Sequence, residues 1–330
     1  MIKNILKFFI GVFGFLFILY FSGPQVASPE LYKILPAVPQ DLVELSNWID
    51  TKEAQVEDLK KGNEGRIEFF DSIPKKTEYS VIYFHGFSAS SEEGAPFHTD
   101  VAKHFKANLY LPRLFGHGVG GENPLRDFTA DTYLESAREA LAVAKTLGEK
   151  VIVLGTSNGG TLSLLLGTDP QIVSIGLFSP NIRIKDPNAS LITLPWGLNL
   201  ASFVAGSDYH QMQNVVSPKE NFWTTRYHIQ ALTHVQKLLE VAMTPETFAK
   251  IKVPVFMGYY YKDEANQDDV VSVAAMLEMF EELGTSAAQK EKMAFPETGD
   301  HVMTSYLTSK DVESVTKHPI RVVETHLPTN

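Results

Sequence analysis

One short turn constrains the fold of this chain more than any other part of the sequence: the pentapeptide Gly-Thr-Ser-Asn-Gly at residues 155–159. Four aliphatic residues at 151–154 precede it and predict a short buried strand, and an apolar segment at 160–166 predicts the start of a helix. A serine between small residues on a strand-to-helix turn is typical of a nucleophile elbow. Glycines two positions before and after the serine remove the Cβ atoms that would collide in so sharp a bend. We therefore take Ser157 as the candidate nucleophile.

Strands and helices alternate on both sides of this turn, which predicts an α/β fold with a mostly parallel central sheet and helices on both faces. The expected strands cover residues 66–70, 79–84, 108–111, 151–154, 172–178, 253–257 and 292–295, and the expected helices cover 41–61, 131–147, 160–166, 225–241, 274–283 and 312–326. The alternation breaks down over about 181–242, where an apolar stretch precedes the helix expected at 225–241. We interpret this segment as a cap inserted over the carboxyl edge of the sheet.

The N-terminal segment has the pattern of an export signal or a membrane anchor. Lys3 and Lys7 precede an uncharged apolar run at residues 8–21. Cleavage after Gly23 or after Ser28 would leave a proline directly behind the cut, so we favour an uncleaved anchor over a removed signal. The positive N-terminal flank predicts that the rest of the chain lies on the outer side of the membrane, or is secreted if the segment is cleaved.

The chain of 330 residues therefore divides into three expected parts. Residues 1–23 form the anchor or signal, residues 24–65 form a proline-rich tether and an N-terminal helix, and residues 66–330 form the main domain with its cap insertion. A net charge of −10 and the lack of a basic stripe argue against a nucleic-acid partner. The chain has no cysteine, which excludes disulfides, a thiolate nucleophile and a Cys-ligated metal.

A serine hydroxyl is a poor nucleophile at neutral pH until a base accepts its proton and an acid orients that base. On an elbow of this kind the expected chain order is serine, acid, histidine. His301 lies in a loop directly after the last expected strand, which makes it the candidate base. The loop at 262–272 offers four carboxylates, and we favour Asp268 because it lies just ahead of the next helix. Asp263 is a serious rival for the acid and Asp269 a lesser one.

Acyl chemistry also needs hydrogen-bond donors where negative charge develops on the substrate oxygen. The loop His85-Gly86-Phe87 follows a strand that neighbours the elbow strand, so the backbone N–H groups of Phe87 and Asn158 form the expected pair. We expect His85 to hold that loop in place. His117, in the Gly-His-Gly turn of the next loop, is also expected to be structural.

These motifs together resemble the α/β-hydrolase fold, from about residue 80 to the C-terminus. The elbow, His-Gly-Phe at 85–87, Gly-His-Gly at 116–118, the Asp-x-x-Val loop at 268–271 and Gly-Asp-His at 299–301 carry the resemblance. Within that superfamily the chain is similar to the bacterial carboxylesterase and monoacylglycerol-lipase-like branch, which shares motifs with the serine aminopeptidase group. The cap matches least.

The resemblance implies roles for single residues. Ser157 would be the nucleophile, Asp268 the acid and His301 the base, and the N–H groups of Phe87 and Asn158 would form the oxyanion hole. No metal or organic cofactor is implied.

The expected function is a membrane-tethered serine hydrolase that cleaves carboxylic esters through an acyl-enzyme intermediate. The apolar cap favours a small-molecule or lipid ester with an acyl chain. A serine aminopeptidase is the alternative, and it would need an acidic pocket for a free amine, from Glu220, Asp208 or the cluster around Asp263. A membrane-tethered scaffold without catalysis is a third possibility.

Overall fold

A seven-stranded sheet forms the centre of the body in the computed structural model, which describes the chain apart from residues 1, 214, 216 and 327–330. Across the sheet the strands are β1 (Arg66–Glu68), β3 (Asn108–Leu111), β2 (Thr77–Phe84), β4 (Gly148–Thr156), β5 (Ile172–Phe178), β8 (Val255–Tyr259) and β9 (Lys290–Ala294). β1 pairs with β3 in the antiparallel sense, and all other neighbours are parallel. The predicted sheet is therefore confirmed, with its elbow strand at the centre.

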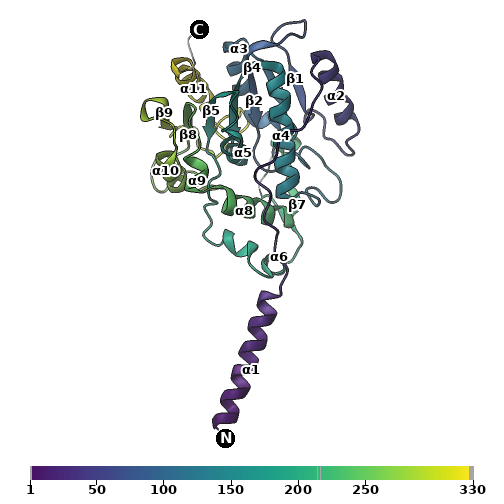
Figure 1. Ribbon diagram of the computed structural model, residues 1–330, viewed down its shortest axis with the longest axis vertical. Coiled ribbons are helices and arrows are strands. Elements are labelled where there is room, and N and C mark those ends of the chain that lie inside the picture. Colours follow the sequence, from purple (N-terminus) through teal and green to yellow (C-terminus); the bar gives the residue numbers. More distant parts are fainter. Residues whose placement is uncertain (1, 214, 216, 327–330) are drawn as a thin grey trace.

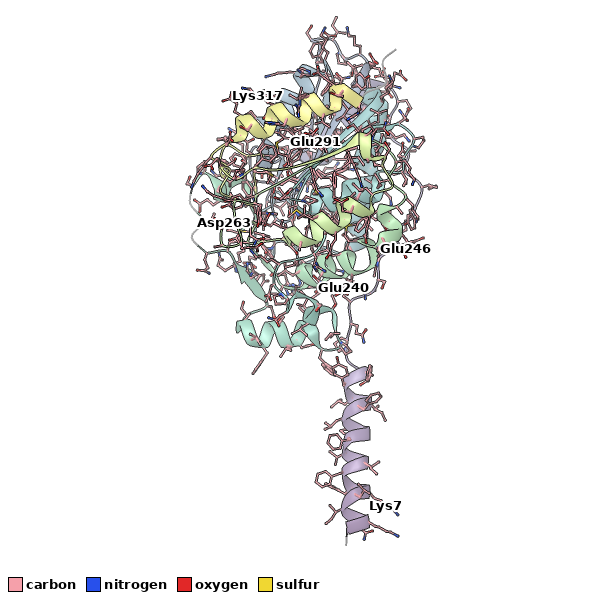
Figure 2. All side chains as sticks on the ribbon, turned by 90° about the vertical axis from the view of Figure 1, so that its left-hand side faces the viewer. Lys7, Glu240, Glu246, Asp263, Glu291 and Lys317 are labelled. Carbon is pink, nitrogen blue, oxygen red and sulfur yellow. The ribbon has the colours of Figure 1, made fainter. Side chains whose placement is uncertain are left out.

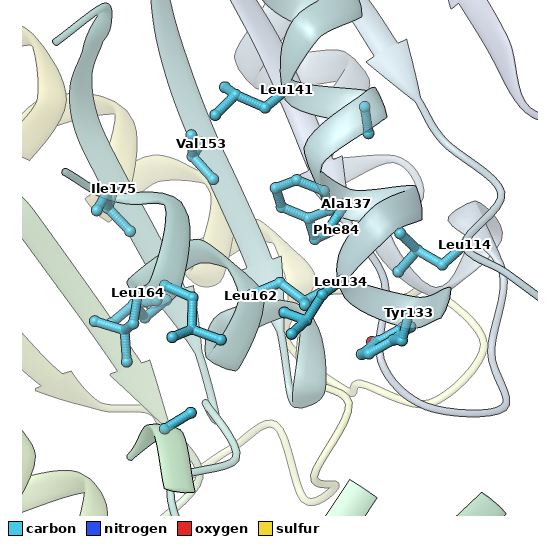
Figure 3. Packing of buried hydrophobic residues seen from close by; sticks show 14 of the residues in the cluster. Phe84, Leu114, Tyr133, Leu134, Ala137, Leu141, Val153, Leu162, Leu164 and Ile175 are labelled. Atoms are coloured by element: carbon cyan, nitrogen blue, oxygen red, sulfur yellow. The ribbon is translucent and has the colours of Figure 1, made fainter. Parts of the chain in front are cut away.

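Helices cover both faces of the sheet, as predicted (Figure 1). On one face, α3 (Phe97–His104) and α11 (Val312–His326) pack over a cluster that includes Val81, Ile152 and Phe178. On the other face, α4 (Ala130–Leu147) and α5 (Asn158–Leu166) bury residues such as Leu134, Leu141 and Leu162 (Figure 3). The same cluster includes buried residues of α2 (Leu42–Ala54), α9 (Pro245–Phe248) and α10 (Val273–Glu282). Because both faces are covered, the central strands are apolar at successive positions.

Between β5 and β8 lies a long segment, residues 179–254, that we call the insertion. It contains η2 (Ala189–Thr193), α6 (Gly197–Ala205), β6 (Tyr209–Gln211), α7 (Lys219–Phe222), β7 (Arg226–His228), α8 (Gln230–Ala242) and α9. β6 and β7 pair in a short antiparallel ribbon. The helix expected over 225–241 begins only at Gln230, because the residues before it are paired with β6.

Some other boundaries differ from the sequence pattern. The helix expected over 41–61 ends at Ala54, and Asp58 and Gly62 beyond it take positive φ values that a helix does not allow. The first strand ends at Glu68. α3 is not predicted by the pattern, since only four of its eight residues are buried and its sequence is strongly polar.

The helix α1 (Ile2–Phe21) projects from the body, and residues 3–21 are exposed (Figure 1). It has the length and composition of a membrane span, a property that signal sequences share. Residues 24–39 form no helix or strand and run along α4, where Arg138 donates hydrogen bonds of 2.8 Å to the carbonyl oxygens of Glu30 and Leu31. The extended segment is therefore attached to the body.

Candidate active site

Ser157 lies at the sharp bend where β4 ends and α5 begins. Its backbone has φ 55° and ψ −120°, a sparsely populated region for a residue with a side chain. A Cβ at Gly159 would lie 1.9 Å from the carbonyl oxygen of Phe84, and one at Gly155 would lie 2.4 Å from the hydroxyl of Ser163. Both glycines are therefore required by close approach, as the pentapeptide predicts.

His301 and Asp268 form a buried pair beside this bend. His301 Nδ1 donates to Asp268 Oδ2 at 2.7 Å, and Asp268 is 0% exposed. The other carboxylate oxygen of Asp268 accepts from the backbone N–H groups of Val270 and Val271 at 3.0 and 2.9 Å. These three bonds fix the carboxylate and orient the imidazole.

Neither rival acid is bonded to His301 among the described residues. Asp263 is exposed and accepts hydrogen bonds from the backbone N–H groups of Ala265 and Asn266 in its own loop (Figure 2). Asp269 is also exposed. Of the three candidates, the structure brings Asp268 to His301.

Burial and mutual attraction act in opposite directions on this pair. Burial opposes the charged form of each group, but the partner's charge and the hydrogen bonds outweigh it. The pKa of Asp268 is therefore lowered and the pKa of His301 is raised. An imidazole held in this way accepts a proton readily, and the ionised carboxylate stabilises the imidazolium that results.

Ser157 and His301 line the same cavity, whose volume is about 680 Å³. The remaining imidazole nitrogen, Nε2, is buried and has no partner among the described residues. In that part of the chain no hydrogen bond joins Ser157 to His301. Such bonds are often long without substrate and tighten when substrate is bound.

The loop after β2 lies against the elbow. A Cβ at Gly86 would lie 3.0 Å from Ser157 Cβ, so the backbone of this loop passes directly beside the nucleophile. Within the described chain, the N–H groups of Phe87 and Asn158 donate to no backbone carbonyl. Both are therefore free to donate to a substrate oxygen.

Two buried histidines hold the neighbouring loops. His85 lies between the carbonyl of Gly86, 2.9 Å from Nδ1, and the N–H of Leu114, 3.2 Å from Nε2. Burial lowers the pKa of His85 to about 4, so the neutral ring donates to the first group and accepts from the second. His117 Nδ1 contacts the carbonyl of Phe115 at 2.9 Å in the same loop. This arrangement supports the structural roles expected for both histidines.

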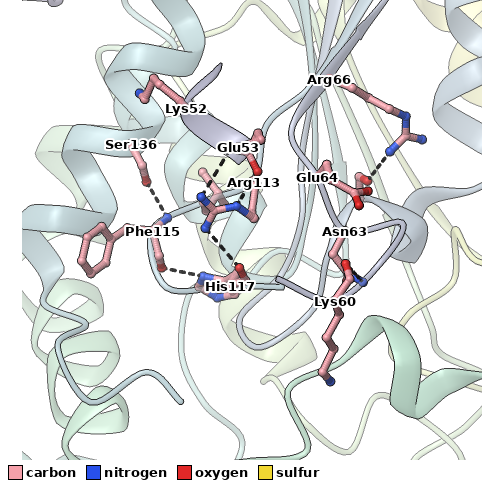
Figure 4. Close-up of polar contacts among 12 residues, drawn as sticks. Lys52, Glu53, Lys60, Asn63, Glu64, Arg66, Arg113, Phe115, His117 and Ser136 are labelled. Carbon is pink, nitrogen blue, oxygen red and sulfur yellow. Dashed lines mark hydrogen bonds and ion pairs between the residues drawn. The ribbon is translucent and has the colours of Figure 1, made fainter. Parts of the chain in front are cut away.

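The loop that contains His117 is attached to α2 by an ion pair. Arg113 Nε donates to Glu53 Oε2 at 2.7 Å, and both side chains are largely buried (Figure 4). A second guanidinium nitrogen of Arg113 donates to the carbonyl of His117 at 3.3 Å. Helix α2 therefore helps to hold the loop after β3 at the carboxyl edge of the sheet.

Glu93 is a buried residue of this site that the sequence analysis misses. Its carboxylate oxygen Oε2 accepts from the backbone N–H of Gly86 at 2.6 Å and from the hydroxyl of Tyr83 at 3.1 Å. The side chain is 2% exposed and lines the cavity with Ser157 and His301. Burial raises the pKa of Glu93 to about 7, although the N–H of Gly86 and the nearby His301 oppose that shift. A glutamate in a loop rich in serine and glycine is usually exposed to solvent, so the sequence gives no sign that Glu93 is buried.

The insertion supplies most of the apolar wall of the cavity. Its contributing residues are Ile184, Ala189, Ile192, Met212, Trp223, Tyr227, Leu232 and Val235. Charged side chains also line the cavity, namely Asp186, Lys219, Asp269 and Asp300. Of the carboxylates expected for a peptidase, Asp269 from the cluster around Asp263 lines the cavity, whereas Glu220, Asp208 and Asp263 are not among the described lining residues.

The described residues include no group of three or more His, Asp or Glu side chains placed to hold a metal ion.

Solved structures share this architecture. One described with the metagenome-derived lipolytic enzymes LipS and LipT is 17% identical, with a TM-score of 0.64 over 81% of this chain and 100% of the other. A monoacylglycerol lipase from Paleococcus ferrophilus is 15% identical, with a TM-score of 0.57 over 80% and 99%. An enol-lactonase from Burkholderia xenovorans LB400 is 14% identical, with a TM-score of 0.52 over 80% and 98%. The chain has the α/β-hydrolase fold.

These comparisons establish the fold of the chain and no more, because the sequence identities are 14–17%. No family model matches the chain, and no curated protein matches it in sequence. The resemblance to the α/β-hydrolase fold is thus confirmed, and the narrower carboxylesterase branch stays a prediction.

Proposed function

We propose that this α/β-hydrolase is a serine hydrolase that cleaves carboxylic esters, with Ser157 as nucleophile, His301 as base and Asp268 as acid. One observation carries the proposal: His301 is bonded through Nδ1 to a fully buried carboxylate, and its free Nε2 shares a cavity with the strained Ser157. Nucleophile, base and orienting acid in this order are the parts that covalent acyl transfer requires.

In the first half-reaction, the hydroxyl oxygen of Ser157 attacks the ester carbonyl carbon while its proton passes to His301 Nε2. The carbonyl oxygen becomes negatively charged and accepts hydrogen bonds from the N–H groups of Phe87 and Asn158. The bond to the leaving alkoxide then breaks, and His301 protonates that oxygen. In the second half-reaction, water attacks the acyl carbon while His301 accepts its proton, the bond from that carbon to Ser157 Oγ breaks, and His301 returns the proton to Ser157 as the carboxylic acid leaves.

The cavity favours an ester with an apolar acyl group. Its wall from the insertion is mostly aliphatic and aromatic, and its volume of about 680 Å³ suits a medium-sized substrate. Lipolytic enzymes and a monoacylglycerol lipase are among the structurally similar proteins. We therefore assign the insertion the role of a cap that encloses the acyl chain.

Glu93 completes the proposed site as a positioning residue. Its hydrogen bond to the N–H of Gly86 holds the His85–Gly86 peptide, one peptide before the one that carries the N–H of Phe87, and so restrains the loop beside Ser157.

A serine peptidase of the aminopeptidase type is the second candidate. The observation that favours it is the set of carboxylates in the cavity, Asp186, Asp269 and Asp300, since a carboxylate is what a substrate's free amine would bind. Comparing rates on an aminoacyl anilide and on an acyl ester of similar size separates the two functions. We expect the ester to be turned over at least tenfold faster.

Helix α1 is the basis for a proposal on where the protein lies relative to a membrane. We propose that α1 is an uncleaved anchor and that the body lies on the outer side of the membrane, because Lys3 and Lys7 precede the apolar run.

The proposed function is tested by replacing the nucleophile. Ser157→Ala should lower kcat on a short p-nitrophenyl ester by at least about 10⁴-fold while the circular dichroism spectrum stays unchanged. Ser72→Ala, at an exposed serine in the loop before β2, is the matched control and should keep full activity. Retained activity in the Ser157 variant would contradict the proposal.

A further inference from the structure

Helix α6 of the insertion presents a continuous apolar face to the outside. Four large apolar residues lie along one side of α6 and its N-terminal cap, because they recur at helical spacing: Trp196, Leu200, Phe203 and Val204. All four are exposed, Phe203 at 83% and Val204 at 76%. Large apolar side chains gathered in this way on a surface mark an interaction site more often than a surface in contact with water.

The same part of the chain carries no charge. Residues 187–207 are 21 consecutive uncharged residues, in a protein in which 21% of residues are charged. Leu191 and Leu194, which precede α6, are exposed as well. Whatever binds this surface therefore does so through apolar contacts, because residues 187–207 offer no charge for an ion pair.

The position of α6 indicates what covers its apolar face, because α6 lies beside the end of α1. Trp196 Nε1 donates to the carbonyl of Leu19 in the last turn of α1 at 3.1 Å, and the N–H of Trp196 donates to the carbonyl of Pro24 at the same distance. Figures 1 and 2 show α6 beside the end of α1 that meets the body, with Lys7 near the opposite end. If α1 crosses a membrane, the exposed face of α6 lies at the surface from which α1 emerges.

The neighbouring surface also leads toward the catalytic cavity. A crevice of about 230 Å³ lies between the segment after α1 and the insertion, and its lining includes Pro24, Leu194 and Leu198. Ile192 lines both this crevice and the cavity that contains Ser157. The crevice and the cavity therefore adjoin at Ile192.

We propose that the apolar face of α6 inserts into the outer leaflet of the lipid bilayer and forms a second attachment beside α1. This inference rests on the anchor assigned under the proposed function. A bilayer fits the surface because the face is apolar, uncharged and continuous with α1, and because tryptophan is enriched at membrane interfaces. Attachment at two points fixes the orientation of the body, so that the cavity receives ester lipids from the leaflet.

The absence of native cysteine makes a direct test simple. A Phe203→Cys variant of the full chain is labelled with an environment-sensitive fluorophore and reconstituted in phosphatidylcholine nanodiscs that contain doxyl-labelled lipid. Ile73→Cys is the matched control: Ile73 is an exposed apolar residue, at 74%, in the loop before β2 at the opposite edge of the sheet. A label at Val204→Cys repeats the measurement should the first variant fold poorly.

We expect doxyl lipid to quench the labels at 203 and 204 at least threefold more strongly than the label at 73. Equal, weak quenching at all three positions overturns the proposal. A blue-shifted label at 203 that doxyl lipid does not quench also overturns it, because a protein partner or a second copy of the chain then covers the face.

A second variant separates docking from catalysis. Replacing Leu200, Phe203 and Val204 by serine should lower turnover of a long-chain ester embedded in vesicles at least tenfold, and should change turnover of a soluble short ester less than twofold. The quenching result does not depend on catalysis. Strong quenching without hydrolysis of either ester contradicts the proposed function and leaves the docking surface intact.

Discussion

The carboxylate of Glu93 accepts a hydrogen bond of 2.6 Å from the backbone N–H of Gly86, directly before the proposed oxyanion donor Phe87. This contact links a buried acid to the loop that must stay rigid during catalysis. Oxyanion donors act only if they are already in place when charge develops. The side chain that holds the loop should therefore matter for kcat more than for KM.

Removing this contact should slow catalysis without abolishing it. Glu93→Ala leaves the N–H of Gly86 without its acceptor, and we expect kcat on a short ester to fall about 10- to 100-fold while KM changes less than threefold. Glu93→Gln keeps an oxygen acceptor and should stay within about threefold of the parent. Equal losses in both variants would show that the contact itself is unimportant.

The same residue should make the stability of the fold depend on pH. The pKa of Glu93 is raised by burial from 4.5 to about 7, so the folded chain keeps a proton that the unfolded chain releases. Its contribution is therefore fully present below about pH 4.5 and is lost as the pH rises through 7. A shift of this size corresponds to about 3 kcal/mol.

Glu93→Gln tests this dependence, because glutamine does not ionise. Of the charged groups near Glu93, His301 and Lys219 oppose the rise in its pKa, and both remain in the variant. Urea unfolding of the two proteins between pH 5 and 8 should show the parent losing about 2.5 kcal/mol relative to the variant, most of the full contribution. Parallel profiles would contradict the assignment.

The rate should depend on the ionisation of His301. Its pKa lies above 6.5, because the attraction of Asp268 outweighs the opposing effect of burial. The base is therefore protonated and inactive at low pH, and kcat/KM should rise with pH through a pKa above 6.5.

Asp268→Asn removes the charge that raises this pKa. We expect kcat to fall about 10³- to 10⁴-fold, and the residual activity to rise at a lower pH than in the parent. An unchanged pH profile with high activity would assign the orienting role to another acid. Asp263→Asn, at the exposed rival, should leave both the rate and the profile unchanged.

The close contact at the elbow predicts a specific effect on stability. A Cβ at Gly159 would lie 1.9 Å from the carbonyl oxygen of Phe84, so Gly159→Ala should lower the free energy of unfolding by about 3 kcal/mol or more. Gly120→Ala is the control, because its nearest atom would lie 3.7 Å away. We expect that control to stay within about 0.5 kcal/mol in urea unfolding.

The sheet could be predicted from the sequence because its strands are buried on both faces and stand out as short apolar runs, as at 151–154. The elbow and the loop at 301 can be proposed as site segments from the sequence because both are short local turns with a recognisable pattern. Ser157 sits between two glycines that close approach requires, and this constraint is visible in the pentapeptide itself.

Features that depend on long-range packing could not be predicted in the same way. The sequence favours Asp268 for its place just ahead of a helix but leaves Asp263 open as a rival, and only the contact of Asp268 with His301, 33 residues away, separates the two acids. Glu93 is buried only because the loop after β2 folds over it. Residues 226–228 pair with β6, which overrides their helix-like pattern.

The central claim is that Ser157 is the activated nucleophile, and mapping a covalent adduct tests it most directly. The full chain is treated with a fluorophosphonate, digested and analysed by mass spectrometry, together with Ser157→Ala and with Ser88→Ala, which alters another serine of the same cavity. We predict one adduct, on the peptide that contains Ser157, in the parent and in the Ser88 variant, and none in the Ser157 variant. An adduct on a different residue, or no adduct in the parent, would contradict the account.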